Sequence, residues 1–243
     1  TAILDQQIAR ARDLLDQLGL SRVIETGARY LLNRREKHDP TLLDPDPDRR
    51  QARIEFLRRA IDIAASLGAE SVSLWSGKLP DRAGPEQALS RLVESLQPVL
   101  QQAERRDMVL AFEPEPGMFI DTFEQFARLD ERIGHSLFQL TVDLGHVHCI
   151  EEGPVGGHLR RWGDRIRNIH IEDMNRGVHE HLMFGEGSMD FAEIFDALRA
   201  IGYAQGLHVE LSRHSHMAVE AVRASSRFLR PLMSALGTPR SID

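Results

Sequence analysis

Strand-like and helix-like segments alternate strictly along the chain, and this alternation limits the folds that are open to it. In the strand-like segments polar and apolar residues alternate or apolar residues run together, whereas in the helix-like segments apolar residues recur every three or four positions. Strands separated by helices pair in parallel, because a parallel pair needs a long crossover connection. We therefore predict an α/β fold. The expected strands are residues 21–27, 71–77, 108–117, 138–148, 166–172 and 207–212, and the expected helices are residues 3–18, 48–67, 85–106, 122–133, 154–162, 191–202 and 216–236.

Six parallel strands separated by helices favour a closed barrel, the common arrangement of such units in a single domain. A barrel of this kind has eight strands, and an open sheet of six would leave two unpaired edges and an unfilled core. We therefore predict a (β/α)8 TIM barrel whose first β-α-β portion is missing upstream of Thr1. Because no linker, low-complexity tract or charge run interrupts the sequence, residues 1–243 are expected to form a single domain.

Charge and cysteine content argue against several classes of partner. A net charge of −7 without a cluster of Lys and Arg argues against a nucleic acid. No apolar run approaches the roughly 20 residues of a membrane-spanning helix, and no signal peptide is visible. Cys149 is the only cysteine, so an internal disulfide is impossible and a reducing compartment is expected. We expect a cytoplasmic protein with no membrane partner, which could form a homo-oligomer.

Carboxylates and imidazoles are placed at the ends of the last four predicted strands. Active sites of barrel enzymes lie at the carboxyl ends of their strands, and ten of the 11 histidines fall between positions 135 and 216. Converging carboxylates would repel one another and would be costly to bury unless a cation lay between them. Mixed oxygen and nitrogen ligands suit Mn²⁺, Co²⁺ or Zn²⁺ better than Ca²⁺. The residues concerned are Glu113, Asp143, His170 and Glu210.

Other polar residues near strand ends have two interpretations each. Glu115 and Glu172 could contact substrate or form salt bridges within loops. Glu25 and His38, with Arg29 and Lys37, follow an earlier strand and could hold a polar or anionic substrate, or belong to a solvated charged loop.

The segment after the strand at 166–172 is predicted to be a polar loop that leads to a helix capped by Asp190. His179 and His181 lie two residues apart, so in extended chain their side chains face the same side. Together with His146 they could chelate a second ion, contact substrate or line the entrance to the site.

From Ser21 to the C-terminus the chain resembles the sugar isomerase/epimerase and endonuclease IV superfamily of divalent-metal TIM barrels. The resemblance implies that the four strand-end residues named above form the metal centre, with Glu113 and Glu210 also carrying the substrate proton. It further implies that His146, three residues after Asp143, and Arg176 of the Asn-Arg pair hold substrate oxygens.

The endonuclease branch of this superfamily has an extra zinc at the position of the loop that carries His179 and His181. In this chain His179, His181 and His146 could bind such an ion. The histidine that this branch carries on the strand matching residues 71–77 is absent, and Trp75 and Ser76 stand there. The negative net charge also argues against a DNA substrate.

These features together predict a divalent-metal-dependent isomerase or epimerase of a small sugar, keto-sugar or polyol-derived substrate. Two glutamates would move a proton next to a carbonyl while an enediolate is stabilised. A lyase or dehydratase acting through the same enolate is one alternative, and an endonuclease IV-like phosphodiesterase is another. A barrel that only binds a metabolite has no need of two bases, so Glu113 and Glu210 argue against that interpretation.

Overall fold

The computed structural model describes residues 2–27 and 29–234. Contacts divide the chain into two compact units, Thr1–Leu140 and Thr141–Asp243, and each is described by itself. Among the described residues no helix combines the length and apolar character needed to cross a membrane.

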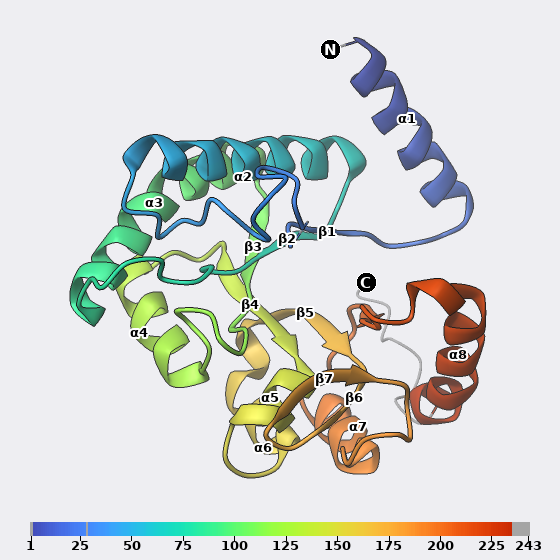
Figure 1. Cartoon of the computed structure of the whole chain (residues 1–243). Coiled ribbons are helices and arrows are strands. Elements are labelled where there is room, and N and C mark those ends of the chain that lie inside the picture. Colours follow the sequence, from blue (N-terminus) through green and yellow to red (C-terminus); the bar gives the residue numbers. More distant parts are fainter. Residues whose placement is uncertain (1, 28, 235–243) are drawn as a thin grey trace. The chain divides into compact units, whose positions relative to one another are not determined.

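The first unit is a parallel sheet with its connecting helices (Figure 1). Its strands follow one another in chain order, β1-β2-β3-β4, and the pairs β1–β2, β2–β3 and β3–β4 are all parallel. Strand β4 continues into the second unit. The elements are α1 (Ala2–Gln17), β1 (Val23–Glu25), α2 (Pro47–Leu67), β2 (Ser71–Leu74), α3 (Pro85–Arg106), β3 (Val109–Phe112), α4 (Phe123–Ile133) and β4 (Phe138–Asp143).

The second unit begins with the end of β4 and contains two further parallel strands in the order β4-β5-β8. Strand β5 pairs with β8 in parallel. A separate antiparallel pair, β6–β7, lies between β5 and α7 in the sequence. The elements are α5 (Leu144–Ile150), α6 (Val155–Trp162), β5 (Ile166–Ile171), β6 (Asp173–Asn175), β7 (Val178–Leu182), α7 (Phe191–Ala200), β8 (Leu207–Val209) and α8 (Ala218–Ser234), with short 3-10 turns at Gly163–Arg165 and Ser215–Met217.

Local sequence explains where the helices begin and end. Thr122 starts α4 with a capping box, in which its side chain accepts from the Gln125 backbone N–H and the Gln125 side chain accepts in return. Gly68 ends α2 in the left-handed conformation that glycine adopts without strain. Helix α2 begins at Pro47, one residue before the expected start at residue 48, and Asp46 caps it: the Asp46 carboxylate accepts from the Asp48 N–H.

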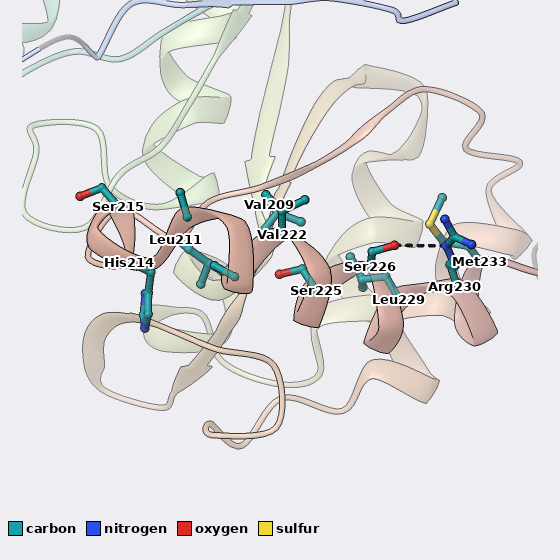
Figure 2. Close-up of a pocket in the computed structure, with 12 residues that line it drawn as sticks. Val209, Leu211, His214, Ser215, Val222, Ser225, Ser226, Leu229, Arg230 and Met233 are labelled. Atoms are coloured by element: carbon teal, nitrogen blue, oxygen red, sulfur yellow. Dashed lines mark hydrogen bonds between the residues drawn. The ribbon is translucent and has the colours of Figure 1, made fainter. Parts of the chain in front are cut away.

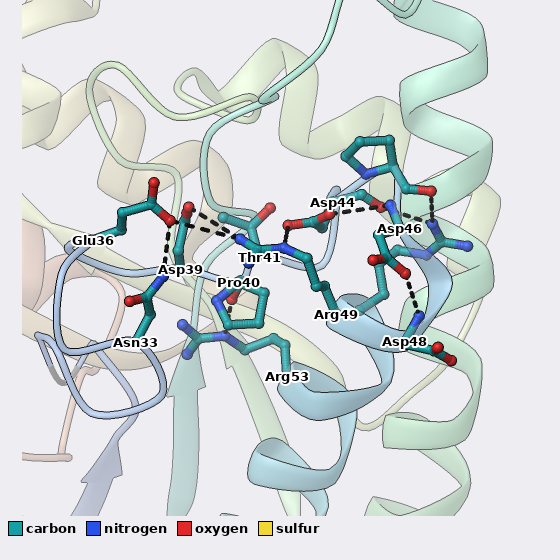
Figure 3. A network of polar contacts seen from close by, with 12 residues as sticks. Asn33, Glu36, Asp39, Pro40, Thr41, Asp44, Asp46, Asp48, Arg49 and Arg53 are labelled. Atoms are coloured by element: carbon teal, nitrogen blue, oxygen red, sulfur yellow. Dashed lines mark hydrogen bonds and ion pairs between the residues drawn. The ribbon is translucent and has the colours of Figure 1, made fainter.

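The proline-rich segment before α2 has no helix or strand, but it is held by a polar network (Figure 3). Arg49 donates to Asp44 at 2.7 Å and pairs with Asp39 at 3.4 Å. The buried Arg53 guanidinium donates to the carbonyls of Pro40 and His38 at 2.8 and 2.7 Å. The Arg53 bonds satisfy backbone carbonyls that have no partner in a helix or strand, and all four contacts tie the segment to the start of α2.

Two further predictions are corrected in the second unit. Residues 144–148 do not continue β4, because the Asp143 carboxylate accepts from the His146 N–H and starts α5 directly at the end of the strand. The polar segment that carries His179 and His181 is a β-hairpin rather than a loop, since Gly177, at φ 75°, permits a tight turn between β6 and β7. The predicted helix 216–236 is observed as α8 after a short 3-10 turn, and residues 235–236 lie outside the described residues.

Candidate metal centre

His170 and Glu210 meet at the carboxyl ends of two paired strands. Residue 170 lies opposite residue 208 in the β5–β8 register, and the Glu210 N–H donates to the Ile171 carbonyl directly after β8. This register brings His170 Nδ1 to 3.1 Å from Glu210 Oε2. Burial would raise the pKa of Glu210, but the hydrogen bond with His170 and the nearby His170 and His181 rings together outweigh it, and the pKa lies below its ordinary value. Glu210 is therefore an anion at neutral pH.

Asn168 orients the His170 ring from the other side. It lies on the same face of β5, with its amide nitrogen 3.1 Å from His170 Nε2 and 3.4 Å from Thr141 Oγ1, while its Oδ1 has no hydrogen-bond partner among the described residues. Amide oxygen and nitrogen are interchangeable by a half-turn of the side chain. With the amide turned, Oδ1 would accept an Nε2–H of His170, and Nδ1, which hydrogen-bonds Glu210 when no ion is bound, would offer its lone pair to an ion.

Asp143 completes a set of three ligands in the second unit. Its Oδ1 caps α5 by accepting from the His146 N–H at 2.8 Å, while Oδ2 has no hydrogen-bond partner in the described part of the chain. Burial would raise the pKa of Asp143, but the nearby histidines, His146 first among them, hold it at about 2. Ligand atoms of Asp143, His170 and Glu210 lie within 4.8 Å of one another. Two carboxylates and one imidazole form a ligand set that suits Mn²⁺, Co²⁺ or Zn²⁺.

Glu113, the fourth predicted ligand, belongs to the first unit. It follows β3 directly, is 4% exposed, and its N–H donates to the Leu74 carbonyl at 2.8 Å. In the β3–β4 pair Phe112 lies opposite Leu140, so Glu113 comes directly after the last paired residue of its strand.

A cluster of three histidines lies on α5 and the β6–β7 hairpin. The ring centroids of His146 lie 4.7 Å from His179 and 5.7 Å from His181, and those two are 5.4 Å apart. Nitrogen atoms of all three lie within 4.8 Å of one another. Burial lowers the pKa of His146 to about 4, so its imidazole is neutral at pH 7 and able to act as a ligand. The alternation of side chains along the chain correctly placed His179 and His181 on one side.

Glu172 lies next to His181 of this cluster. It is 0% exposed, and neither of its carboxylate oxygens has a hydrogen-bond partner among the described residues. Its Oε2 is 3.8 Å from His181 Nδ1. Burial and the neighbouring Asp143 raise the pKa of Glu172 well above its ordinary value. Sequence reasoning left the role of Glu172 open, because nothing in the pattern of β5 showed that the residue after it would be sealed from solvent.

The remaining candidate residues have other surroundings. The Arg176 guanidinium donates to the carbonyls of Glu151 and Gly153, at the end of α5. In the first unit, Glu25 accepts from the N–H groups of its own turn, and His38 lies edge-on to Trp75 with ring centroids 5.1 Å apart.

Sequence reasoning missed two residues at this site. Asn168 carried a usable signal, since it shares a face of β5 with His170. Gly145 carried none, because its importance depends on the Glu172 side chain that lies over it.

Comparisons with known proteins agree with the fold. Residues 1–232 match the family model described as xylose isomerase-like TIM barrel. L-ribulose-5-phosphate 3-epimerase UlaE of Salmonella paratyphi A is 24% identical over 193 residues, which are 79% of this chain and 68% of that protein. A solved structure of L-ribulose 3-epimerase superposes with a TM-score of 0.76 at 23% identity, over 94% of this chain and 80% of the other. The IolI protein with a bound zinc atom gives a TM-score of 0.74 at 18% identity, over 94% and 82%.

Proposed function

The chain belongs to the xylose isomerase-like TIM barrel family, and on that premise we propose that it is a divalent-metal-dependent epimerase or isomerase of a small keto-sugar. The observation that carries the proposal is the convergence of Asp143, His170 and Glu210 at adjacent strand ends. The names of the relatives support a ketose or ketose phosphate as the substrate class.

In this proposal Asp143, His170 and Glu210 hold one Mn²⁺, Co²⁺ or Zn²⁺ ion, and Glu113 is the fourth ligand. The three buried or half-buried ligands of the second unit fit such an ion, since Asp143 Oδ2 has no hydrogen-bond partner in the described part of the chain. The bound ion would polarise a carbonyl and a neighbouring hydroxyl of the sugar, which acidifies the proton on the carbon between them.

Glu113 and Glu210 are the proposed proton carriers. One carboxylate removes the proton from one face of the carbon, and the other returns it to the opposite face for epimerisation, or to the adjacent carbon for isomerisation. The lowered pKa of Glu210 keeps it ionised and able to accept the proton at neutral pH.

The substrate-binding residues that we propose are His146, Arg176, Glu25 and His38. His146 is neutral and its ring lies within the histidine cluster, so it can exchange hydrogen bonds with sugar hydroxyls. For Arg176 to reach a substrate, its guanidinium must leave the two carbonyls that it contacts in this structure. The complete burial of Glu172 favours a supporting role over direct contact with substrate.

The proposal is tested by incubating the metal-loaded protein with a panel of ketoses and ketose 5-phosphates and separating the products by chromatography. We expect one member of the panel to give its epimer or aldose isomer, and a chelator to abolish the conversion. A panel without conversion, in protein shown to contain the ion, would argue against the proposed function.

A second candidate function is metal-dependent phosphodiester hydrolysis, which the cluster of His146, His179 and His181 favours because it could bind a further ion. A lyase acting through the same enolate is distinguished by its product, which would have lost water or another group. Assay of a phosphodiester beside the sugar panel separates these activities.

A further inference from the structure

A group of buried ligand atoms lies beside the proposed metal centre and shares only Asp143 with it. Asp143 Oδ2, both oxygens of Glu172 and His181 Nδ1 are buried and have no hydrogen-bond partner among the described residues. One ligand atom from each of the three residues lies within 4.8 Å of the others. The three residues are 2%, 0% and 8% exposed, so water from bulk solvent does not satisfy them.

We propose that Asp143, Glu172 and His181 bind a second divalent transition-metal ion, with the Asp143 carboxylate shared between the two ions. The inference rests on the proposed function in one respect only, namely that Asp143 also belongs to the first site. Two carboxylate oxygens and an imidazole nitrogen form a ligand set that suits Zn²⁺, Co²⁺ or Mn²⁺.

The electrostatics of the group favour a cation over an empty arrangement. Two carboxylates buried side by side are costly unless a positive charge or a hydrogen-bond donor compensates them. His181 Nδ1 lies 3.8 Å from Glu172 Oε2, which exceeds hydrogen-bond distance. The neighbouring cluster of three histidines does not need a cation to compensate buried charge, because a neutral imidazole can be buried without a counter-charge.

Gly145 provides the space that Glu172 occupies. A Cβ atom on Gly145 would lie 1.9 Å from Glu172 Oε1 and 2.8 Å from Met174 Cε. The first turn of α5 therefore accepts the carboxylate only because residue 145 has no side chain. The arrangement positions Glu172 against the residue that ends β4, and places it across from a histidine of β7.

A second ion at this position would tie the β6–β7 hairpin to the end of β4. His181 would be held by its Nδ1, and the exposed His179, two residues earlier on the same strand, would be held with it. Loss of the ion is expected to loosen the hairpin while the first site, apart from the shared Asp143, is retained.

The test counts metal ions per chain. Protein is saturated with Zn²⁺ or Co²⁺, dialysed against metal-free buffer, and analysed by inductively coupled plasma mass spectrometry, with Co²⁺ absorbance as a second readout. We expect two ions in the natural chain and one in Glu172→Gln, which keeps size and shape but removes the charge. Gly145→Ala should also bind one, although every ligand is chemically intact. The matched control is Glu180→Gln on the same hairpin, where the natural carboxylate pairs with Arg213 at the surface, and it should bind two.

Circular dichroism establishes that each variant is folded before ions are counted. One ion in the natural chain, or two in folded Glu172→Gln, would overturn the proposal. Loss of the second ion in His179→Ala but not in Glu172→Gln would assign it to the three-histidine cluster and would also overturn it. Failure of the proposed function gives a different result: His170→Ala would still bind the first ion, whatever number of ions Glu172→Gln binds.

Discussion

His170 Nδ1 and Glu210 Oε2 lie 3.1 Å apart, although 40 residues separate them in the chain. Their contact follows from the parallel register of β5 and β8, which brings the two strand ends to the same level. We propose that both residues bind the ion that activates the substrate. Metal binding and proton removal would then both depend on the register of β5 against β8.

The substitution His170→Ala should remove the first ion, because it deletes the one nitrogen ligand of that site. Binding of the first ion at a hundredfold excess of metal over Kd should stabilise the natural protein by about 2.7 kcal/mol, and this part of the metal-dependent gain should be lost in the variant. His208→Ala, at the position paired with His170, serves as the control and should keep the metal-dependent gain. Thermal unfolding with and without metal measures the difference. Equal gains in the two variants would contradict the assignment.

Asn168→Ala should weaken the first site without removing a ligand. The carboxamide lies 3.1 Å from His170 Nε2 and holds the ring from that side, and loss of such an outer partner typically costs about 10- to 100-fold in metal affinity. Isothermal titration with Mn²⁺ or Zn²⁺ measures the change. Asn33→Ala, a substitution in the first unit, is the control for a general effect of losing an asparagine, and an unchanged affinity in Asn168→Ala would exclude the orienting role.

Glu113→Gln and Glu210→Gln should each lower kcat by about 10²–10⁴, because a positioned general base is lost while the side chain keeps its size and one oxygen. For an epimerase, one of the two variants should still exchange the proton of one epimer while failing to convert it. Glu186→Gln, an exposed glutamate, is expected to leave kcat unchanged. Near-normal turnover in both test variants would rule out the mechanism with two glutamates.

The first unit should lose stability as the pH falls from about 6.5 to about 4, in part through His38. Burial and nearby positive side chains, Lys37 first among them, lower the pKa of His38 from 6.5 to about 4. In this window the unfolded chain binds a proton that the folded chain rejects, so the free energy of unfolding decreases as the pH is lowered. His38→Gln should show a shallower decrease in urea unfolding across this range, whereas His216→Gln, at an exposed position, should follow the natural protein. Identical pH profiles for His38→Gln and the natural protein would contradict the shift.

The alternation of strands and helices predicted the parallel strands, because the existence of each strand could be recognised from local pattern even where its end could not. The same pattern placed Asp143, His170 and Glu210 at strand ends, and the structure brings their ligand atoms together. Local pattern did not reveal the early start of α5, which depends on the bond between the Asp143 carboxylate and the His146 N–H.

Two other features depend on contacts between segments that are distant in the sequence. The hairpin form of the segment that carries His179 and His181 requires the pairing of β6 with β7. The burial of Glu172 over Gly145 requires α5 to pack against the residues that follow β5, which no single segment encodes.

Solvent deuterium incorporation tests the central claim most directly. The metal-loaded protein is incubated in D₂O with the ketose or ketose 5-phosphate that it converts, and the product is analysed by proton NMR. The proposed mechanism predicts deuterium at the inverted carbon of the product, and no incorporation after the ion has been removed with a chelator. Inversion of that carbon with full retention of the original proton, or incorporation that persists without the ion, would contradict metal-assisted proton transfer by Glu113 and Glu210.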